Sequence, residues 1–441
     1  MITEKAKQSA AGDLREALNG VAQSRHAALE EIRRNAVADF ERLGFPSTRD
    51  EEWKYTRVAT LFNEPLSPGI HHTDASHIKI QGENSLPGHE NANVLVFING
   101  VFTPDFSVIR SAGLNVLPLD EAYAQPEFRP VIAQNFGHAA GYVKDGIYAL
   151  NTAFLSEGVF ISSANNAVIE EPVYLYHIRG AETATLACPR LFIHVGERSE
   201  ITFAEHYFGT SAATQVVNQV TEIIVEKDAH LEFYRLQNEG DQISQINTTH
   251  IRQIGKSVVN TVTISLGGKM VRNNLHAVLE AEHAEAHLYG LYFLKDKNQV
   301  DNHTIVDNVV PNCLSNELYK GVLDDLSAGV FNGKVYVRKD AQKTNAFQSN
   351  KNILLSDSAT VNTKPQLEIF ADDVKCSHGC TVGSLDPEGL FYLQSRGIPY
   401  DSAVALLLQG FAMDVLDKIR HEPIREYARA LIVKQLTKER V

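Results

Sequence analysis

The chain has 441 residues, of which 44% are hydrophobic and 22% are charged, proportions that are ordinary for a soluble globular protein. A net charge of −13 without any basic run argues against nucleic-acid binding, because phosphate contacts need a concentrated basic surface. No apolar stretch approaches the roughly 20 residues of a membrane span and the polar start lacks a signal-peptide core, so we expect a cytoplasmic protein that binds neither nucleic acid nor membrane.

The first region, residues 1–93, is expected to begin with helix and to end in a loop. Apolar residues recur at spacings of three and four between 29 and 43, which is the pattern of one helix face. Ser24 is the expected N-cap, and Gly44 is expected to end the helix. Residues 65–93 are polar and rich in proline and glycine, and we expect there a surface loop that carries His71, His72 and His77.

The middle region, residues 94–384, has almost no helical periodicity and consists of short β-rich runs separated by small or polar turn residues. Most gaps between these turns are close to multiples of about 15 residues. A repeating unit of strand and turn over this length favours a β-helix, with a large two-sheet sandwich as the alternative. The runs are Val94–Ile98, Val173–His177, Leu191–Val195, Val220–Val225, Leu231–Leu236, Val258–Ile264 and Lys334–Val337.

The last region, residues 385–441, returns to helix. Pro387 is expected at the first position of one helix and Gly397 just past its end, while Asp401 and Pro423 open two more. The second helix is long enough to dock on the core and still present an apolar face to a partner. Packing against its own core alone is the alternative, and the candidate partner-binding residues are Leu407, Leu408, Phe411 and Val415.

Motifs of a self-sufficient enzyme are absent from the sequence. It contains no phosphate-binding G-x-x-x-x-G-K-[ST] loop, no G-x-G-x-x-G after a strand and no G-x-S-x-G. The four cysteines are too sparse for a disulfide framework and form no paired C-x-x-C zinc site. Two of them, Cys188 and Cys313, are expected to be small buried hydrophobic residues, and a catalytic site on this chain is not expected.

Two histidines at 283 and 287 have the i, i+4 spacing that lets a helix share a metal between them. The surrounding sequence is typical of strand and turn, however. On a strand the two Cα atoms would lie about 13 Å apart, because each residue rises about 3.3 Å. We therefore expect a structural or solvated role for His283 and His287.

A candidate metal or cluster site is formed by Cys376, His378 and Cys380. On an extended segment these three side chains project from one face, and thiolate and imidazole are ligands suited to iron, zinc or clusters. Because the two cysteines would lie about 13 Å apart on a straight strand, one strand cannot surround a single metal. The alternatives are a half-site completed by another strand or subunit, or a strand end with two inert thiols.

The segment 370–379, Phe-Ala-Asp-Asp-Val-Lys-Cys-Ser-His-Gly, closely resembles the SufD family of iron–sulfur cluster assembly proteins. The resemblance runs in the same order from about residue 45 to about residue 420. Its other pieces are Glu52-Trp-Lys-Tyr-Thr, Val96-Phe-Ile-Asn-Gly, Leu150-Asn-Thr-Ala-Phe, Gly290-Leu-Tyr, Leu318-Tyr-Lys-Gly-Val-Leu, Gly329-Val-Phe-Asn-Gly-Lys, Ala341-Gln-Lys-Thr, Asn350-Lys-Asn-Ile-Leu-Leu-Ser, Leu390-Phe-Tyr-Leu and Ser395-Arg-Gly-Ile.

This resemblance implies a mainly β fold, with a right-handed parallel β-helix core over 94–384 between N-terminal and C-terminal helical regions. It implies a scaffold subunit that joins the paralogous subunit SufB through the β-helix and the ATPase SufC through the C-terminal helices. A homodimer is possible when the chain is alone. No cofactor is expected to bind tightly to the chain by itself, and iron or a nascent iron–sulfur cluster would be held transiently in the complex. His378 takes the position of the family's cluster-building histidine, followed by Cys376 and, more weakly, Cys380.

Two positions depart from the family pattern. Asn308 stands where relatives often carry histidine, and Cys380 stands where many carry alanine, which either adds a thiol or is a neutral exchange. Two other functions are alternatives to a SufD-type scaffold. One is a SufB-like cluster-holding subunit, although such chains are usually longer and richer in cysteine. The other is a β-helix carbohydrate-active enzyme, for which the sequence lacks a convincing pair of catalytic acids.

Overall fold

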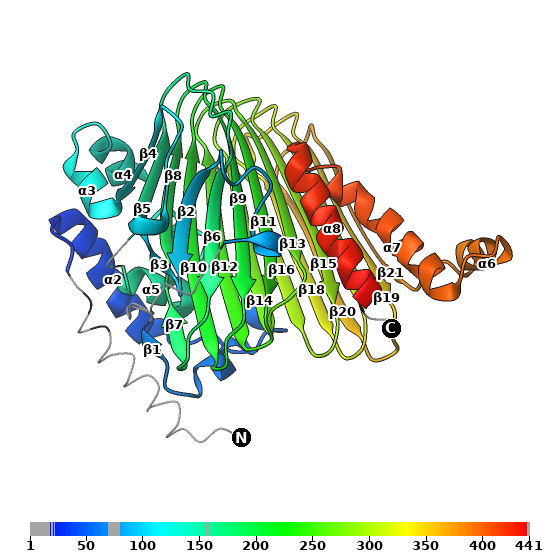
Figure 1. The fold of residues 1–441 in the computed structure, drawn as a ribbon. Helices are drawn as coiled ribbons and strands as arrows, with labels where there is room; N and C mark the ends of the chain where they lie inside the picture. Colours follow the sequence, from blue (N-terminus) through cyan, green and yellow to red (C-terminus); the bar gives the residue numbers. More distant parts are fainter. Residues whose placement is uncertain (1–17, 19–20, 22, 69–79, 156–157, 439–441) are drawn as a thin grey trace.

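In the computed structural model, which describes residues 18, 21, 23–68, 80–155 and 158–438, the protein is mainly β, with 41% strand and 24% helix. A parallel β-solenoid of about eight turns forms the core, and helical regions flank it (Figure 1). The predicted parallel β-helix between helical ends is thereby confirmed. No helix within these described ranges is both long and apolar enough to cross a membrane. The expected histidine loop at 71–77 lies outside the described residues.

Each coil of the solenoid gives one strand to each of two sheets, so that from Arg190 to Gly383 consecutive strands alternate between them. Sheet A runs through β4 (Leu114–Pro118), β5 (Val159–Ser163), β8 (Arg190–Val195), β10 (Gln215–Val225), β12 (Ile243–Gln253), β14 (Met270–Leu279), β16 (Gln299–Asn308), β18 (Ala328–Val337) and β20 (Thr360–Ile369), with β1 (Ser67–Pro68) and β7 (Thr185–Ala187) at its side. Sheet B runs through β3 (Val101–Phe102), β2 (Asn93–Ile98), β6 (Val173–Arg179), β9 (Glu200–Gly209), β11 (His230–Glu239), β13 (Val258–Ser265), β15 (Glu285–Leu294), β17 (Leu314–Leu323), β19 (Asn345–Leu354) and β21 (Lys375–Gly383).

The register explains the repeat of about 15 residues seen in the sequence. Gln299 on β16 pairs with Ala328 on β18, one full coil later, so the sequence repeat corresponds to one strand and its turn, which is half a coil. One corner of successive coils is made by residues in the left-handed conformation, among them Asp228 (φ 56°), His283 (φ 63°) and Asn312 (φ 63°). Polar residues of these types tolerate that conformation best after glycine.

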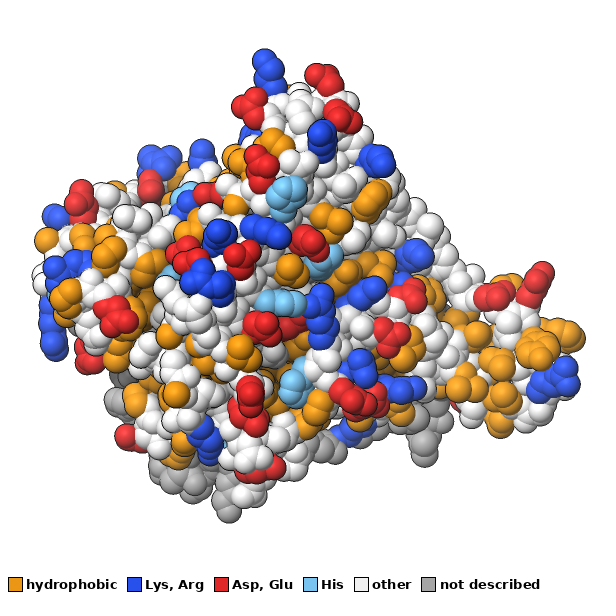
Figure 2. Space-filling view, turned by 90° about the horizontal axis from the view of Figure 1, so that it is seen from above, with side chains coloured by type: hydrophobic (Ala, Val, Ile, Leu, Met, Phe, Trp, Pro, Cys, Tyr) orange, Lys and Arg blue, Asp and Glu red, His pale blue; other side chains and the backbone are white. Residues whose placement is uncertain are grey.

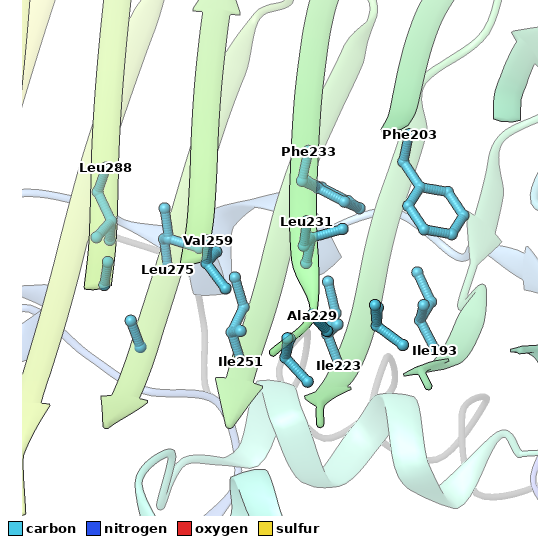
Figure 3. Close-up of a cluster of buried hydrophobic side chains, with 14 of the residues drawn as sticks. Ile193, Phe203, Ile223, Ala229, Leu231, Phe233, Ile251, Val259, Leu275 and Leu288 are labelled. Carbon is cyan, nitrogen blue, oxygen red and sulfur yellow. The ribbon is translucent and has the colours of Figure 1, made fainter. Parts of the chain in front are cut away.

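The lumen between the sheets is divided into an apolar half and a polar half. Next to the left-handed corner, Ile193, Ile223 and Ile251 of sheet A pack against Phe203 and Phe233 of sheet B (Figure 3). The other half of the lumen is lined by buried amide side chains that bond to one another. These include Gln237, Gln245, Asn247, Asn273 and Asn302. Alternation along each strand therefore does not simply place apolar residues inside and polar residues outside.

The N-terminal helix α2 (Ala27–Leu43) ends at Gly44, as predicted, but it begins later than predicted. His26 is the N-cap residue, and Ser24 instead accepts a hydrogen bond from the His26 backbone N–H. Short 3-10 turns are found at η1 (Glu51–Trp53), η2 (Val58–Phe62), η4 (Gly82–Asn84), η5 (Pro104–Phe106) and η6 (His138–Gly141).

The middle region contains three helices that the sequence did not predict. They are α3 (Leu119–Ala124), α4 (Arg129–Asn135) and α5 (Gly146–Ala153), and they lie between β4 and β5. With six to eight residues each, they contain too few turns for a 3.6-residue period to stand out. The expectation that this region has almost no helix was wrong for this insertion.

Three helices follow the solenoid: α6 (Pro387–Ser395), α7 (Tyr400–Leu416) and α8 (Glu422–Lys438). Asp386 caps α6 through the backbone N–H of Glu388, and Gly397 (φ 84°) follows its end, as predicted. The other two begin within one residue of the predicted starts at Asp401 and Pro423. Helices α7 and α8 lie across sheet B, and α6 projects beyond the last strands (Figure 1).

Candidate functional site

The solenoid ends at β20 and β21, and in the described part of the chain each of these strands pairs on one side only. β20 pairs with β18, and β21 pairs with β19. Their other backbone edges are unpaired. Apolar side chains are exposed around this open end, at Phe347, Ile369, Phe370 and Val382. An edge of two long unpaired strands with exposed apolar side chains is a surface on which another chain can pair.

The three candidate residues on β21 project toward the lumen at this open end. Cys376, His378 and Cys380 align in register with Ala346, Gln348 and Asn350 of β19, and those three neighbours are buried. Because parallel strands in register keep their side chains on a common face, the candidate residues share the lumen side. Cys376 is half-buried, whereas His378 and Cys380 are exposed.

The row that contains His378 can be followed through the whole core. On sheet B it passes through Phe203, Phe233, Thr261, Leu288, Glu317, Gln348 and His378, one residue per coil. Its first members belong to the apolar core, and its last members are polar. The polarity of the row therefore increases toward the open end of the solenoid.

Glu317 is a carboxylic acid inside the solenoid, two coils below His378. Burial raises its pKa to about 7, although hydrogen bonds from Thr304 and Gln348 oppose the rise. Thr304 Oγ1 donates to one carboxylate oxygen from the opposite sheet, and Gln348 Nε2 donates to the other at 3.0 Å. The side-chain oxygen of Gln348 is buried and has no partner among the described residues. Sequence reasoning missed both residues.

The thiol of Cys376 is the more enclosed of the two cysteines on β21. Partial burial raises its pKa, so it carries a proton at neutral pH. Thiols bind metal as thiolates, and metal binding here must therefore displace that proton. With about 13 Å between the Cα atoms of Cys376 and Cys380 along the strand, the two thiols cannot ligate one ion.

The remaining residues that the sequence singled out lie away from this end. His283 forms a left-handed corner. His287 on β15 is half-buried, and its Nε2 lies 3.5 Å from Glu285 Oε2. Cys313 is fully buried and Cys188 packs partly buried against the core. Asn308 is fully buried and donates to the Tyr336 carbonyl. Within the described ranges, no three His, Cys, Asp or Glu side chains are arranged to hold a metal ion.

A second polar site lies between the N-terminal region and the outer face of sheet A. A cavity of about 430 Å³ is lined by Trp53, His276 and their neighbours. Lys334 pairs with Glu52 and Arg272 pairs with Asp301, so the charges of this site are compensated internally. The family-like segment that begins at Glu52 thus anchors the N-terminal region to the solenoid.

The four predicted partner-binding residues of α7 differ in how deeply they are buried. Leu408 and Val415 are fully buried in the chain's own core, and Leu407 and Phe411 are half-buried. Lys320 of β17 lies over the Phe411 ring. The two buried side chains face sheet B, so any partner contact in this conformation falls to other residues of the helical region.

An exposed apolar patch nearby was not singled out from the sequence. It consists of Phe391, Tyr392, Tyr400 and Leu406, with Phe391 exposed at 73%. Figure 2 shows hydrophobic side chains gathered over the projecting lobe at the right, where α6 lies in Figure 1. A concentration of large exposed apolar side chains on one lobe is typical of a protein–protein contact surface.

Both halves of the chain match descriptions of known protein families. The family description "SUF system FeS cluster assembly, SufBD core domain" matches residues 177–411, and "SufBD protein N-terminal region" matches residues 7–175. The iron–sulfur cluster assembly SufBD family protein slr0076 of Synechocystis is 31% identical, and the match covers 86% of this chain and 84% of that one.

Two other relatives are named iron–sulfur cluster assembly protein SufD. The one from Escherichia coli is 29% identical, and the match covers 90% of each chain. The one from Bacillus subtilis is 26% identical, and the match covers 92% of this chain and 94% of the relative.

Proposed function

The chain belongs to the SufBD family of iron–sulfur cluster assembly proteins, and we propose that it acts there as the SufD-type scaffold subunit of a SufB–SufC–SufD complex in the cytoplasm. In this role it helps to acquire iron and to build a cluster at the interface with SufB. It is not itself an enzyme, and iron and sulfide are its cargo. ATP hydrolysis is supplied by SufC.

One observation carries the proposal. Cys376, His378 and Cys380 stand in lumen-facing rows of the last coil, next to two unpaired strand edges. Thiolate and imidazole are suitable ligands for iron and for iron–sulfur clusters, and the strand spacing leaves each of them needing further ligands from elsewhere. The arrangement is that of a half-site, to be completed by a second chain at the open end.

The unpaired edges of β20 and β21 support a SufB-type partner. A second solenoid can continue both sheets by pairing with these edges, and the exposed apolar side chains of Phe370 and Val382 would be covered at the same time. The same surface accounts for a homodimer when SufB is absent. In either assembly the lumen-facing ligands of one chain come to face those of the other.

The exposed patch on α6 and α7 supports an ATPase partner. Phe391 and Tyr392 are exposed residues of α6, which projects beyond the last strands (Figure 1). Association of two SufC subunits on ATP binding would pull on the helical domains of SufB and SufD. Because α7 and α8 pack on sheet B, this pull would shift the solenoid interface and open the half-site to iron and sulfide.

The test of this function is the replacement of His378 by alanine in the complex reconstituted with SufB and SufC. We expect cluster formation, followed by absorbance and by iron and sulfide analysis, to fall at least about tenfold, in line with the loss of a ligand or of the group that holds one. Ser377→Ala is the matched control, because Ser377 lies on the same exposed strand with its side chain on the opposite face. An unchanged cluster yield in the His378 variant would remove this residue from the function.

A SufB-like role is the second candidate, since the family descriptions cover both paralogues. The two are separated by asking which subunit the chain replaces. A SufD-type chain restores cluster formation when it is added to SufB and SufC, and a SufB-like chain restores it when it is added to SufD and SufC.

A further inference from the structure

We propose that Gln348 is a positioning residue for His378: its side-chain oxygen accepts a hydrogen bond from the His378 ring, and Glu317 holds the Gln348 amide in the orientation that makes this possible. The importance of this bond for cluster assembly rests on the proposed function of His378. The bond itself is a property of this chain and can be tested separately.

The register places the three side chains in line. Glu317, Gln348 and His378 occupy equivalent positions on β17, β19 and β21. Neighbouring strands lie about 4.8 Å apart, and in-register side chains lie on the same face. The Gln348 side chain therefore lies between the buried carboxylate and the exposed imidazole, within reach of both.

Gln348 is 3% exposed, and its two polar atoms are in different situations. Its Nε2 donates to Glu317 Oε1 at 3.0 Å, whereas its Oε1 is buried and has no partner among the described residues. Buried polar atoms in folded proteins are nearly always paired. His378 is exposed on the adjacent strand, at the position in register with Gln348.

Two neighbours hold the amide in this orientation. Both side-chain oxygens of Glu317 accept hydrogen bonds, one from Thr304 and one from Gln348 Nε2, so the donor end of the amide faces Glu317 and the amide oxygen faces away. On the opposite wall, Gly333 leaves the necessary room, because a Cβ atom at that position would lie 2.4 Å from Gln348 Nε2. The orientation is thus determined by an acceptor on one side and by a missing side chain on the other.

The consequence for His378 is chemical. A neutral imidazole has one N–H and one lone pair. If the N–H is given to Gln348, the lone pair of the other nitrogen points away from the lumen, toward the open end. This is how buried groups behind metal-binding histidines commonly fix the tautomer and the ring orientation.

The test is the tautomer of the neutral His378 ring, measured at alkaline pH by 15N NMR on the full-length chain labelled at histidine, with the His378 signal assigned by its loss in His378→Ala. Since an accepted ring N–H favours the tautomer that carries this proton, we expect Gln348→Met to remove the preference for one tautomer. Gly333→Ala should reduce this preference similarly by displacing the amide. Thr363→Val, which removes another buried unpartnered polar atom from the last coil, should leave it unchanged.

A rescue distinguishes positioning from general damage to the fold. In the double variant E317Q/Q348E the amide and the carboxylate exchange places, so an acceptor oxygen again faces His378. We expect this variant to recover the tautomer preference of the wild-type His378 ring. An identical tautomer ratio of His378 in the wild type and in Gln348→Met would overturn the proposal.

Cluster formation separates this proposal from the proposed function. We expect Gln348→Met to slow cluster formation by about tenfold, and to add nothing when His378 is already alanine. If His378→Ala has no effect on the cluster while Gln348→Met still shifts the tautomer ratio of His378, the bond stands and the proposed function fails. If His378→Ala abolishes the cluster but Gln348→Met shifts neither quantity, the function stands and the positioning role fails.

Discussion

Glu317 shows how a single residue inside the solenoid is linked to solution conditions. Burial raises its pKa from 4.5 to about 7, so between these values the folded chain keeps a proton that the unfolded chain releases. The folded state is therefore favoured at the lower pH, and the stability contributed by this group is lost as the pH rises from about 4.5 to about 7.

Replacing Glu317 by glutamine removes this dependence. We expect the free energy of unfolding of the variant, minus that of the wild type, to increase from pH 5 to pH 8 by up to about 3 kcal/mol, because each pKa unit corresponds to about 1.4 kcal/mol. The variant gains stability relative to the wild type because only the wild type loses stability over this range. Urea unfolding followed by circular dichroism at the two pH values measures it. The same difference between variant and wild type at both pH values would mean that Glu317 has an ordinary pKa.

At the residue scale the sequence predicted the shared face of Cys376, His378 and Cys380, because strand alternation alone decides it. It did not predict that this face is the lumen, which depends on the register of β21 against β19. Glu317 was missed for a related reason. An acidic residue in an alternating strand is expected on the outer face, and only the stacking of coils places it inside, opposite Thr304.

Helix α5 offers a test at the scale of one element. Asp145 caps it by accepting from the backbone N–H groups of Ile147 and Tyr148, and its other oxygen accepts from the Trp53 indole at 3.0 Å. Asp145→Ala removes the cap and leaves a buried indole N–H unpaired. We expect the free energy of unfolding to fall by about 3 kcal/mol, from about 1–2 kcal/mol for the cap and about 1–3 kcal/mol for the unpaired donor.

Asp386 provides the matched control for Asp145. It caps α6 through one backbone N–H, and it is exposed. Asp386→Ala should cost about 1 kcal/mol or less, and thermal unfolding of the two variants gives the comparison. An equal loss in both variants would show that Asp145 is only a helix cap and does not join the N-terminal region to α5.

Prediction from sequence succeeded for elements that carry their own signals. All the β-rich runs named from the sequence coincide with strands, and the glycine and proline positions located the ends of α2 and α6. The short helices α3 to α5 carry no such signal and form because the insertion packs on sheet A. The apolar positions of α7 were recognised, but the sequence could not divide them between Leu408, which faces sheet B, and Leu406, which is exposed.

The whole molecule is a solenoid whose C-terminal end, within the described residues, leaves two strand edges unpaired. The repeat in the sequence predicted the solenoid. It could not predict which end is open, since that depends on what lies beyond the last strand in space. The open end matters at all three scales: it exposes His378, it leaves β20 and β21 unpaired, and it is where we propose that a second chain completes the half-site.

The most direct test of this account is the iron and sulfide content of the chain after anaerobic reconstitution, alone and together with SufB and SufC. We predict that the monomeric chain alone holds no cluster, because the ligands on its one strand are too far apart to surround one. In the complex, iron and sulfide should appear in a ratio typical of a cluster and depend on His378. A complete cluster on the isolated monomer, or a cluster in the complex that is indifferent to His378, would contradict a half-site completed by a partner.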